Sequence, residues 1–245
     1  MSTHPHTAET KNHGKDGIFR RIGSIIRRMT VMVWPDNCAI CDNKLERGES
    51  TLCLKCLTDI PRIRSDSEQM VHGAPGNRVR VRSWFIYDHD DISHRLIHDI
   101  KYHDRRRLAR KLGREFAMQK LADGLPVDVI VPIPLHWTKY VVRSYNQTRE
   151  IALGINDVTG IPVSKNLYAA VAHDSQTNRN REERSRNVED IFAVKNPAEF
   201  DGKHIAILDD VITTGATMHS ALQSILKVSS PASVTFLSLA QTKHF

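Results

Sequence analysis

The chain has 245 residues, of which 40% are hydrophobic, and a formal net charge of +7 at pH 7. This composition excludes a chain that is disordered throughout, and the length suits one α/β domain with an appendage or two small domains. No run of 18 or more apolar residues occurs, so we expect no transmembrane span. The basic balance is compatible with phosphorylated or polyanionic ligands, although many basic proteins have no such partner.

The N-terminal part divides into a polar tail and a basic amphipathic segment. Residues 1–16 are polar and without periodicity, and we expect them to be disordered. Residues 17–34 repeat isoleucine, methionine and valine at helical spacing, with arginines mostly on the other face. We expect a helix that packs on the following domain through its apolar stripe or lies on an anionic membrane. The interrupting arginines and the lack of a small-residue cleavage motif do not fit a signal peptide.

All four cysteines of the chain lie in residues 35–62, as two C-x-x-C pairs, "CAIC" and "CLKC". They are Cys38, Cys41, Cys53 and Cys56. Each C-x-x-C turn directs two thiolates toward one metal, and four thiolates complete a tetrahedral zinc site. The spacing predicts a small zinc ribbon with a structural metal, because four thiolates leave no open position for a catalytic water. Two disulfides or four unconnected thiols are the alternatives.

The sequence pattern changes after the cysteines. Residues 63–79 are polar and contain glycine and proline, and we interpret them as a linker before a domain of residues 80–245. We expect strands at 79–88, 127–135, 166–172, 191–194, 204–210 and 233–240, two helices within 92–122, and further helices at 145–160 and 216–228. This alternation predicts an α/β fold with a mostly parallel sheet covered on both faces. In such sheets ligands bind at the carboxyl ends of the strands.

The stretch "HIAILDDVITTGATMHS", residues 204–220, carries the most informative chemistry. An apolar strand runs into two carboxylates, Asp209 and Asp210, and a turn rich in threonine and glycine then leads into a helix. Backbone N–H groups, hydroxyls and the positive end of the helix dipole favour a phosphate there, and Gly215 permits its close approach. The carboxylates are placed to hold sugar hydroxyls, directly or through a divalent metal. The pattern predicts a ribose 5-phosphate pocket, with an ordinary capped helix after a strand as the alternative.

Several segments also resemble a known family. "AILDDVITTGAT" resembles the 5-phosphoribosyl-1-pyrophosphate (PRPP) binding motif of type I phosphoribosyltransferases. "VDVIVPIPLHWTKYVVRSYNQTREIA", "QTNRNREERSRNVEDIF" and "LIHDIKYHDRRRLARKLG" resemble segments of the ComF family, and the cysteine module after Trp34 and Pro35 resembles its N-terminus. The resemblance runs from about residue 17 to 240. It implies a sheet of the type I phosphoribosyltransferase kind preceded by a small zinc ribbon.

The resemblance also implies roles for individual residues. Asp209 and Asp210 correspond to the catalytic acids that bind the ribose hydroxyls. The PRPP-binding residues would be the 5-phosphate loop (Thr213, Thr214, Gly215, Ala216, Thr217), the pyrophosphate loop (Pro132, Ile133, Pro134), Arg143 opposite the pyrophosphate oxygens, and Arg181 in a hood that closes over the ligand. Ser144 departs from the family, which usually has glycine at this position of the turn.

The implied reaction is displacement of pyrophosphate from C1 of PRPP by a nucleophile, with Mg2+ accompanying the substrate. The sequence does not identify the acceptor, because no stretch is recognisable as a nucleobase pocket. Three hypotheses therefore stay open. The chain is a transferase with an unidentified acceptor or a PRPP sensor without turnover. The third hypothesis, which the resemblance to the ComF family implies, is a competence factor that binds single-stranded DNA or DNA-processing proteins during DNA uptake. PRPP and reduced thiols both imply the cytoplasm.

Overall fold

A computed structural model describes residues 37–49, 51–89, 91–102, 105–135, 144–170, 191–243 and 245. The expected tail at 1–16, the expected helix at 17–34, Arg143 and Arg181 all lie outside the described residues. Within the described ranges, no helix combines the length and apolar character needed to cross a membrane.

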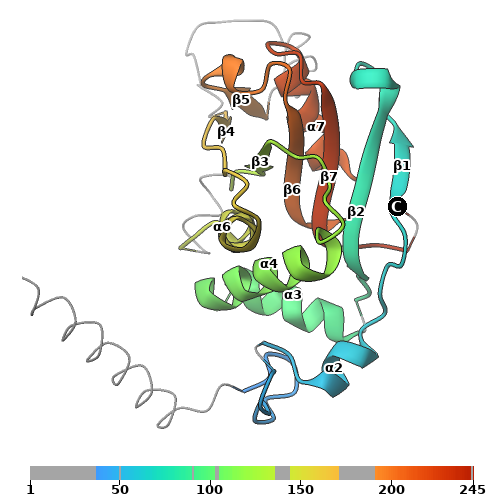
Figure 1. Ribbon diagram of the computed structural model, residues 1–245, viewed down its shortest axis with the longest axis vertical. Coiled ribbons are helices and arrows are strands. Elements are labelled where there is room, and N and C mark those ends of the chain that lie inside the picture. Colours follow the sequence, from blue (N-terminus) through green and yellow to red (C-terminus); the bar gives the residue numbers. More distant parts are fainter. Residues whose placement is uncertain are drawn as a thin grey trace, which may run out of the picture.

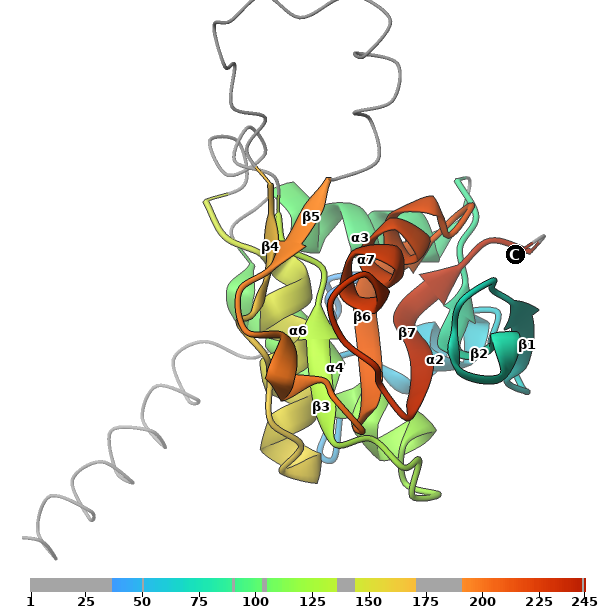
Figure 2. The same cartoon turned by 90° about the horizontal axis from the view of Figure 1, so that it is seen from above.

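Five strands form the central sheet in the order β1-β2-β7-β6-β3 (Figure 2). Strands β2 (Arg78–Ile86), β7 (Ser233–Gln241), β6 (His204–Ile212) and β3 (Val129–Pro132) are mutually parallel along this order. The short β1 (Ser67–Met70) pairs antiparallel with β2 at the edge. This mostly parallel sheet confirms the expected α/β class.

Two hydrophobic cores cover the two faces of the sheet. On one face, α3 (Ile92–Tyr102), α4 (Arg106–Lys120) and α6 (Gln147–Thr159) pack against every second side chain of β6, including Leu208. On the other face, α7 (Ala216–Leu226) packs against the intervening side chains of β6. A strand buried on both sides must be apolar at successive positions, which explains the continuous apolar run of β6.

Helices α4 and α6 lie in backbone contact. A methyl group added to Gly113 would come within 2.1 Å of the carbonyl oxygen of Ile151, and one added to Gly154 within 2.1 Å of that of Arg110. Asp157 on α6 also accepts hydrogen bonds of 2.6 and 2.7 Å from the guanidinium of Arg110. This contact fixes α6, whose N-terminus lies at the carboxyl end of the sheet.

The cysteine segment is joined to the rest of the fold through the core under α3 and α4. Cys38 and Cys56 belong to the same hydrophobic cluster as Trp84 of β2. The backbone N–H of Ile63 donates to the carbonyl of Trp84 at 3.0 Å. Figure 1 shows the segment, in blue with the short helix α2 (Leu54–Asp59), at the end of the molecule next to α3. The hydrogen bond from Ile63 to β2 and the shared hydrophobic core therefore hold the cysteine segment against the rest of the fold.

Residues 63–79, expected to be a linker, contain β1, the 3-10 helix η1 (Pro75–Asn77) and the start of β2. Their polar composition suits an edge strand, because only alternate side chains of β1 are even half-buried. Nearby, the buried guanidinium of Arg82 contacts Asp66 at 2.6 Å and Asp123 at 2.6 Å. These ion pairs tie the segment to the end of α4.

The remaining predicted elements are present with shifted ends. Residues 92–122 form two helices, as expected, and the predicted strands at 166–172 and 191–194 form a separate two-stranded sheet of β4 (Leu167–Ala169) and β5 (Phe192–Val194). The 3-10 helix η2 (Pro197–Glu199) follows β5. Strand β6 continues to Ile212, two residues beyond Asp210, because its pairing with β7 continues to Gln241.

Candidate active site

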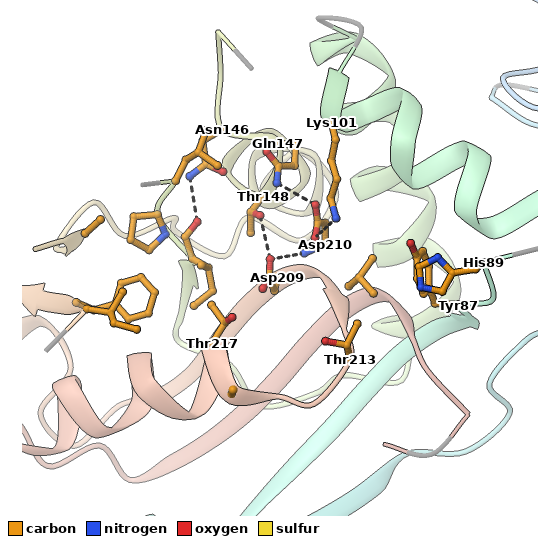
Figure 3. A pocket seen from close by; sticks show the side chains of 18 residues that line it. Tyr87, His89, Lys101, Asn146, Gln147, Thr148, Asp209, Asp210, Thr213 and Thr217 are labelled. Atoms are coloured by element: carbon orange, nitrogen blue, oxygen red, sulfur yellow. Dashed lines mark hydrogen bonds and ion pairs between the residues drawn. The ribbon is translucent and has the colours of Figure 1, made fainter. Parts of the chain in front are cut away.

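A cavity of about 590 Å3 opens at the carboxyl ends of β2, β3 and β6. Two carboxylates of β6 lie at its centre, and side chains from α3, the start of α6 and the start of α7 surround them (Figure 3). The predicted site residues that line it are Asp209, Asp210, Thr213, Ala216, Thr217, Ile133 and Pro134. The structure therefore brings together three predicted groups: the acids, the phosphate turn and the turn after β3.

Asp210 is only 4% exposed and is held from two sides. The side-chain amide of Gln147 donates to Asp210 Oδ2 at 2.9 Å, and Lys101 Nζ lies 3.3 Å from Asp210 Oδ1. Figure 3 shows the amide and the ammonium converging on this carboxylate from α6 and α3. These two contacts, one of them with a cation, fix the position of the Asp210 carboxylate.

Asp209 has a different environment. Its Oδ1 accepts a hydrogen bond of 2.8 Å from the backbone N–H of Asp210 and one of 3.4 Å from the hydroxyl of Thr148. Removal from water and then the neighbouring Asp210 carboxylate raise the pKa of Asp209 to about 7. Near neutral pH, Asp209 is therefore able to take up and release a proton.

The turn between β6 and α7 forms the wall below the carboxylates. Gly215, at φ +74°, is the residue before α7 and gives it no side-chain cap. The hydroxyl of Thr214 accepts from the backbone N–H of Ala216 at 3.4 Å, and Thr213 and Thr217 line the cavity. The first N–H groups of a helix have no partner within the helix, so this end is suited to an anion. A methyl on Gly215 would lie 2.5 Å from Cε2 of Phe245, so the Phe245 ring would have to move to accept it.

The turn after β3 forms another wall, and Asn146 fixes it. Asn146 donates from Nδ2 to the carbonyl of Ile133 at 3.0 Å and accepts at Oδ1 from the backbone N–H of Arg149, which caps α6. Ile133 and Pro134 line the cavity, whereas Pro132 belongs to β3 and is absent from the lining. Ser144, where the family usually has glycine, has φ +57°, so this backbone position does favour glycine.

Six polar lining residues were not predicted as site residues: Tyr87, His89, Lys101, Asn146, Gln147 and Thr148. Gln147 and Thr148 follow a helix cap, and the "NQT" sequence was a signal that could have indicated a functional helix start. Lys101 belongs to an amphipathic helix and is indistinguishable in sequence from a basic surface residue. Tyr87 and His89 lie just beyond the end of β2, where parallel strands place ligand-binding groups.

A second cluster, outside the cavity, consists of Cys38, Cys41, Cys53 and Cys56. Their sulfur atoms all lie within 4.8 Å of one another, and those of Cys41 and Cys53 are 3.7 Å apart. Tetrahedral zinc–thiolate bonds of about 2.3 Å place sulfurs roughly 3.8 Å apart, so the arrangement fits a metal ion. Burial and then the neighbouring sulfurs raise the pKa of Cys56, and a bound cation would offset this cost.

The comparisons with known proteins agree with this architecture. Residues 142–244 match the phosphoribosyl transferase domain family. The chain is 25% identical to the DNA utilization protein YhgH of Escherichia coli strain K12 over 78% of its own length and 84% of that protein. It is 24% identical to the competence protein ComFC of Bacillus subtilis over 88% of its length and 89% of that protein. A YhgH protein of Salmonella typhi is 30% identical over 54% of this chain, which spans 60% of that relative.

Among solved structures, the glutamine PRPP amidotransferase of B. subtilis aligns with 58% of this chain at 16% identity and a TM-score of 0.43. The chain spans 30% of that protein. Its homologues, named as competence proteins, and its phosphoribosyl transferase domain support the assignment of this chain to the ComF family.

Proposed function

We propose that this chain binds PRPP in the strand-end cavity and transfers its 5-phosphoribosyl group to an acceptor with release of pyrophosphate. The observation that carries the proposal is the meeting of the two β6 carboxylates with the uncapped start of α7 in one cavity. A ligand that satisfies both needs a phosphate and, a few ångströms away, hydroxyl groups. A ribose 5-phosphate has this composition.

The geometry suggests how the substrate is held. The turn formed by Thr213, Thr214, Gly215, Ala216 and Thr217 would take the 5-phosphate. Asp209 and Asp210 would accept hydrogen bonds from the ribose hydroxyls, and the turn at Ile133 and Pro134 would face the pyrophosphate. Mg2+ prefers carboxylate and phosphate oxygens, and the Asp209–Asp210 pair offers such ligands while the ion neutralises leaving-group charge.

The two carboxylates would then have separate tasks. Asp210 is held in position by Lys101 and Gln147, beside the developing positive charge of the ribose. Asp209, with a pKa of about 7, can take up the proton that the acceptor loses. Fixing the reacting groups in this cavity contributes to the rate by orientation.

We also propose that the cysteine cluster holds a structural zinc ion. The sulfur positions fit a tetrahedral ion, and four thiolates leave no coordination site for a substrate. Because this segment shares its core with α3, which carries Lys101, the ion would stabilise the side of the fold that supports the cavity. Both PRPP and reduced thiolates favour a cytoplasmic location.

A second candidate is a role in DNA handling, in which the same cavity senses PRPP without turnover. The relatives are named as DNA utilization and competence proteins, and three consecutive exposed arginines, Arg105, Arg106 and Arg107, lie at the start of α4. Such a group of cations can contact the phosphates of single-stranded DNA. In this candidate the DNA-contacting surface is distinct from the cavity, which binds PRPP without transferring its ribosyl group.

A calorimetric titration with PRPP, with and without Mg2+, tests the binding proposal. We expect the zinc-loaded protein to bind PRPP and an Asp209→Ala, Asp210→Ala double variant to lose detectable binding. The exposed-residue variant Asp59→Ala serves as a matched control and should bind like the parent. A folded parent protein that does not bind PRPP would refute the proposal. Binding without pyrophosphate release under any acceptor mixture would favour sensing over transfer.

A further inference from the structure

A second hollow of about 690 Å3 lies between the last turns of α4 and α6 and the residues that lead into β3. It is called here the apolar hollow, and its walls include Met118, Leu121, Leu125, Asp128, Val158 and Ile161. Of the described residues that line it, only Asp128 and Thr159 have polar side chains. No described residue lines both this hollow and the candidate active site, so the two are separate.

Two large side chains in the wall of the apolar hollow are exposed. Met118 of α4 is 51% exposed, and Val158 of α6 is 45% exposed. Exposed apolar side chains that gather around a hollow, rather than occurring singly, mark a surface that another segment or molecule covers. The surface is fixed in shape, because α4 and α6 are in backbone contact at Gly113 and Gly154.

The surroundings of the apolar hollow favour a cation at its edge. Helix α4 ends at Lys120 and α6 ends at Thr159, so the negative ends of two helix dipoles meet here. Among the described residues that line the hollow, Asp128 is the only charged one, and it is exposed. An apolar surface with basic residues beside it would therefore match both the hollow and its edge.

The segment at 17–34, which lies outside the described residues, has this composition. Ile22 and Ile25 stand in the middle of its apolar stripe. The segment contains four arginines and no acidic residue. On a helix, Arg21 and Arg28 are seven positions apart and lie on one side of the stripe. The sequence left two partners open for this stripe, the following domain and an anionic membrane.

The same segment is tethered close to the apolar hollow. Two residues separate it from Asn37, the first described residue. The next residue, Cys38, belongs to the same hydrophobic cluster as Leu121 in the wall of the hollow. Beyond the cysteines, the carbonyl of Ile63 accepts a hydrogen bond of 2.9 Å from Lys120 at the end of α4. A helix of 18 residues is about 27 Å long, and so short a tether makes docking intramolecular, which a contact of modest area can stabilise.

We propose that residues 17–34 dock as an amphipathic helix in the apolar hollow of the same chain. The isoleucine stripe packs on Met118 and Val158, and the arginines beside it face Asp128 and the ends of α4 and α6. The segment is then part of the folded domain and not a membrane anchor. This inference is independent of the proposed function, because the hollow lies outside the candidate active site.

Hydrogen exchange of the zinc-loaded full chain tests the docking. Ile25→Asp puts a charge into the stripe, and Ser24→Asp puts the same charge on the opposite face of the expected helix. Met118→Asp changes the wall of the hollow, and Met70→Asp changes a methionine that is 74% exposed on β1. The two test substitutions lie on opposite sides of the proposed contact, so if one variant fails to fold, the other still tests it.

The readout is the exchange of two hydrogen-bonded amides beside the apolar hollow. The backbone N–H of Leu121 donates to Ala117 at 3.0 Å, and that of Gly160 donates to Asn156 at 2.9 Å. We expect Ile25→Asp and Met118→Asp to speed their exchange by about tenfold, because the covering helix is lost. Ser24→Asp, Met70→Asp and the parent should exchange alike, with the amides of α7 as an unchanged reference.

Equal exchange in Ile25→Asp and Ser24→Asp would overturn the proposal. If Ile25→Asp leaves exchange unchanged but abolishes binding to phosphatidylglycerol vesicles, the stripe belongs to a membrane surface and the proposal also fails. A photoreactive benzoylphenylalanine at position 118 identifies the occupant directly. We expect a cross-link to residues 17–34 within one chain, whereas a cross-link between two chains would assign the hollow to a second copy and overturn docking within the chain.

Discussion

The two helices that start at the cavity, α6 and α7, begin in opposite ways. The start of α6 is capped by Asn146, which satisfies the backbone N–H of Arg149 and holds the carbonyl of Ile133. The start of α7 is Gly215 in the left-handed conformation, without a side-chain cap. Helix α6 is further fixed by its backbone contact with α4. The start of α6 is thus capped by a side chain of the protein itself, whereas the start of α7 presents backbone donors that a ligand can satisfy.

This difference separates residues that hold the cavity in shape from residues that contact a ligand. Changes on the α6 side should act mainly on the free energy of unfolding. Changes at the start of α7 should act mainly on ligand affinity. The carboxylates lie between the two walls and should affect both.

The largest effect on stability is expected from Gly154→Ala in α6. The added methyl would lie 2.1 Å from the carbonyl oxygen of Arg110, and two helix backbones would have to separate. We expect the free energy of unfolding to fall by about 3 kcal/mol or more in urea denaturation. Gly124→Ala is the control, because it has φ +79° in open space and should cost only about 1 kcal/mol. Equal costs would show that the helix contact is not tight.

The next effect concerns the pH dependence of stability. The pKa of Asp209 is about 7 in the folded chain against an ordinary value of 3.8, so the folded state retains a proton that the unfolded state has lost. The contribution of this group to stability therefore falls as pH rises from about 4 to 7 and is constant above. We expect Asp209→Asn to gain about 2 kcal/mol relative to the parent between pH 4.5 and 7.5 in denaturation experiments.

Asp157 provides a control of opposite sign for this measurement. Its hydrogen bonds from Arg110 hold the pKa of Asp157 well below the usual range, so it is ionised in both folded and unfolded chains above about pH 5. Asp157→Asn should lower stability by a constant amount over the same pH interval. If Asp209→Asn also changed the free energy of unfolding by a constant amount over this pH interval, the raised pKa of Asp209 would be contradicted.

A smaller effect compares the two helix starts directly. Asn146→Ala removes a helix cap and should cost about 1 kcal/mol of stability. Thr217→Ala, on the exposed first turn of α7, should change stability by no more than about 0.5 kcal/mol yet weaken PRPP binding. Urea denaturation and PRPP calorimetry on both variants give the two readouts. The comparison fails if Thr217→Ala costs more stability than Asn146→Ala or leaves the affinity unchanged.

The smallest effect is expected from Ser144→Gly, just before the α6 cap. Ser144 has φ +57°, where a side chain is strained, and glycine should raise the free energy of unfolding by about 0.5 kcal/mol. Asn77→Gly is the control, because asparagine tolerates its φ of +52°. Thermal denaturation of both variants should show a gain only at position 144. A loss there would mean that the serine side chain stabilises the turn.

Much of the fold follows from local pattern. The apolar run of β6 and the helical period of residues 92–122 were sufficient to predict the parallel sheet and both helices. The segment containing β1 was misinterpreted as a linker, because an edge strand with exposed polar side chains lacks the apolar run that marks a buried strand. The observed end of β6 also differs from the predicted end. Pairing with β7, rather than the composition of the strand, decides where β6 ends.

The sequence by itself determined the parts of the site whose members are neighbours along the chain. Asp209, Asp210 and the turn that follows are contiguous, so their chemistry could be recognised without a fold, and the C-x-x-C pairs likewise imply a shared ligand. The tertiary structure alone decided which distant side chains join them. Gln147 lies 63 positions from Asp210, and Lys101 and Tyr87 reach the cavity from α3 and the end of β2. Periodicity indicates which face of an element is buried, but the strand order decides which element that face meets.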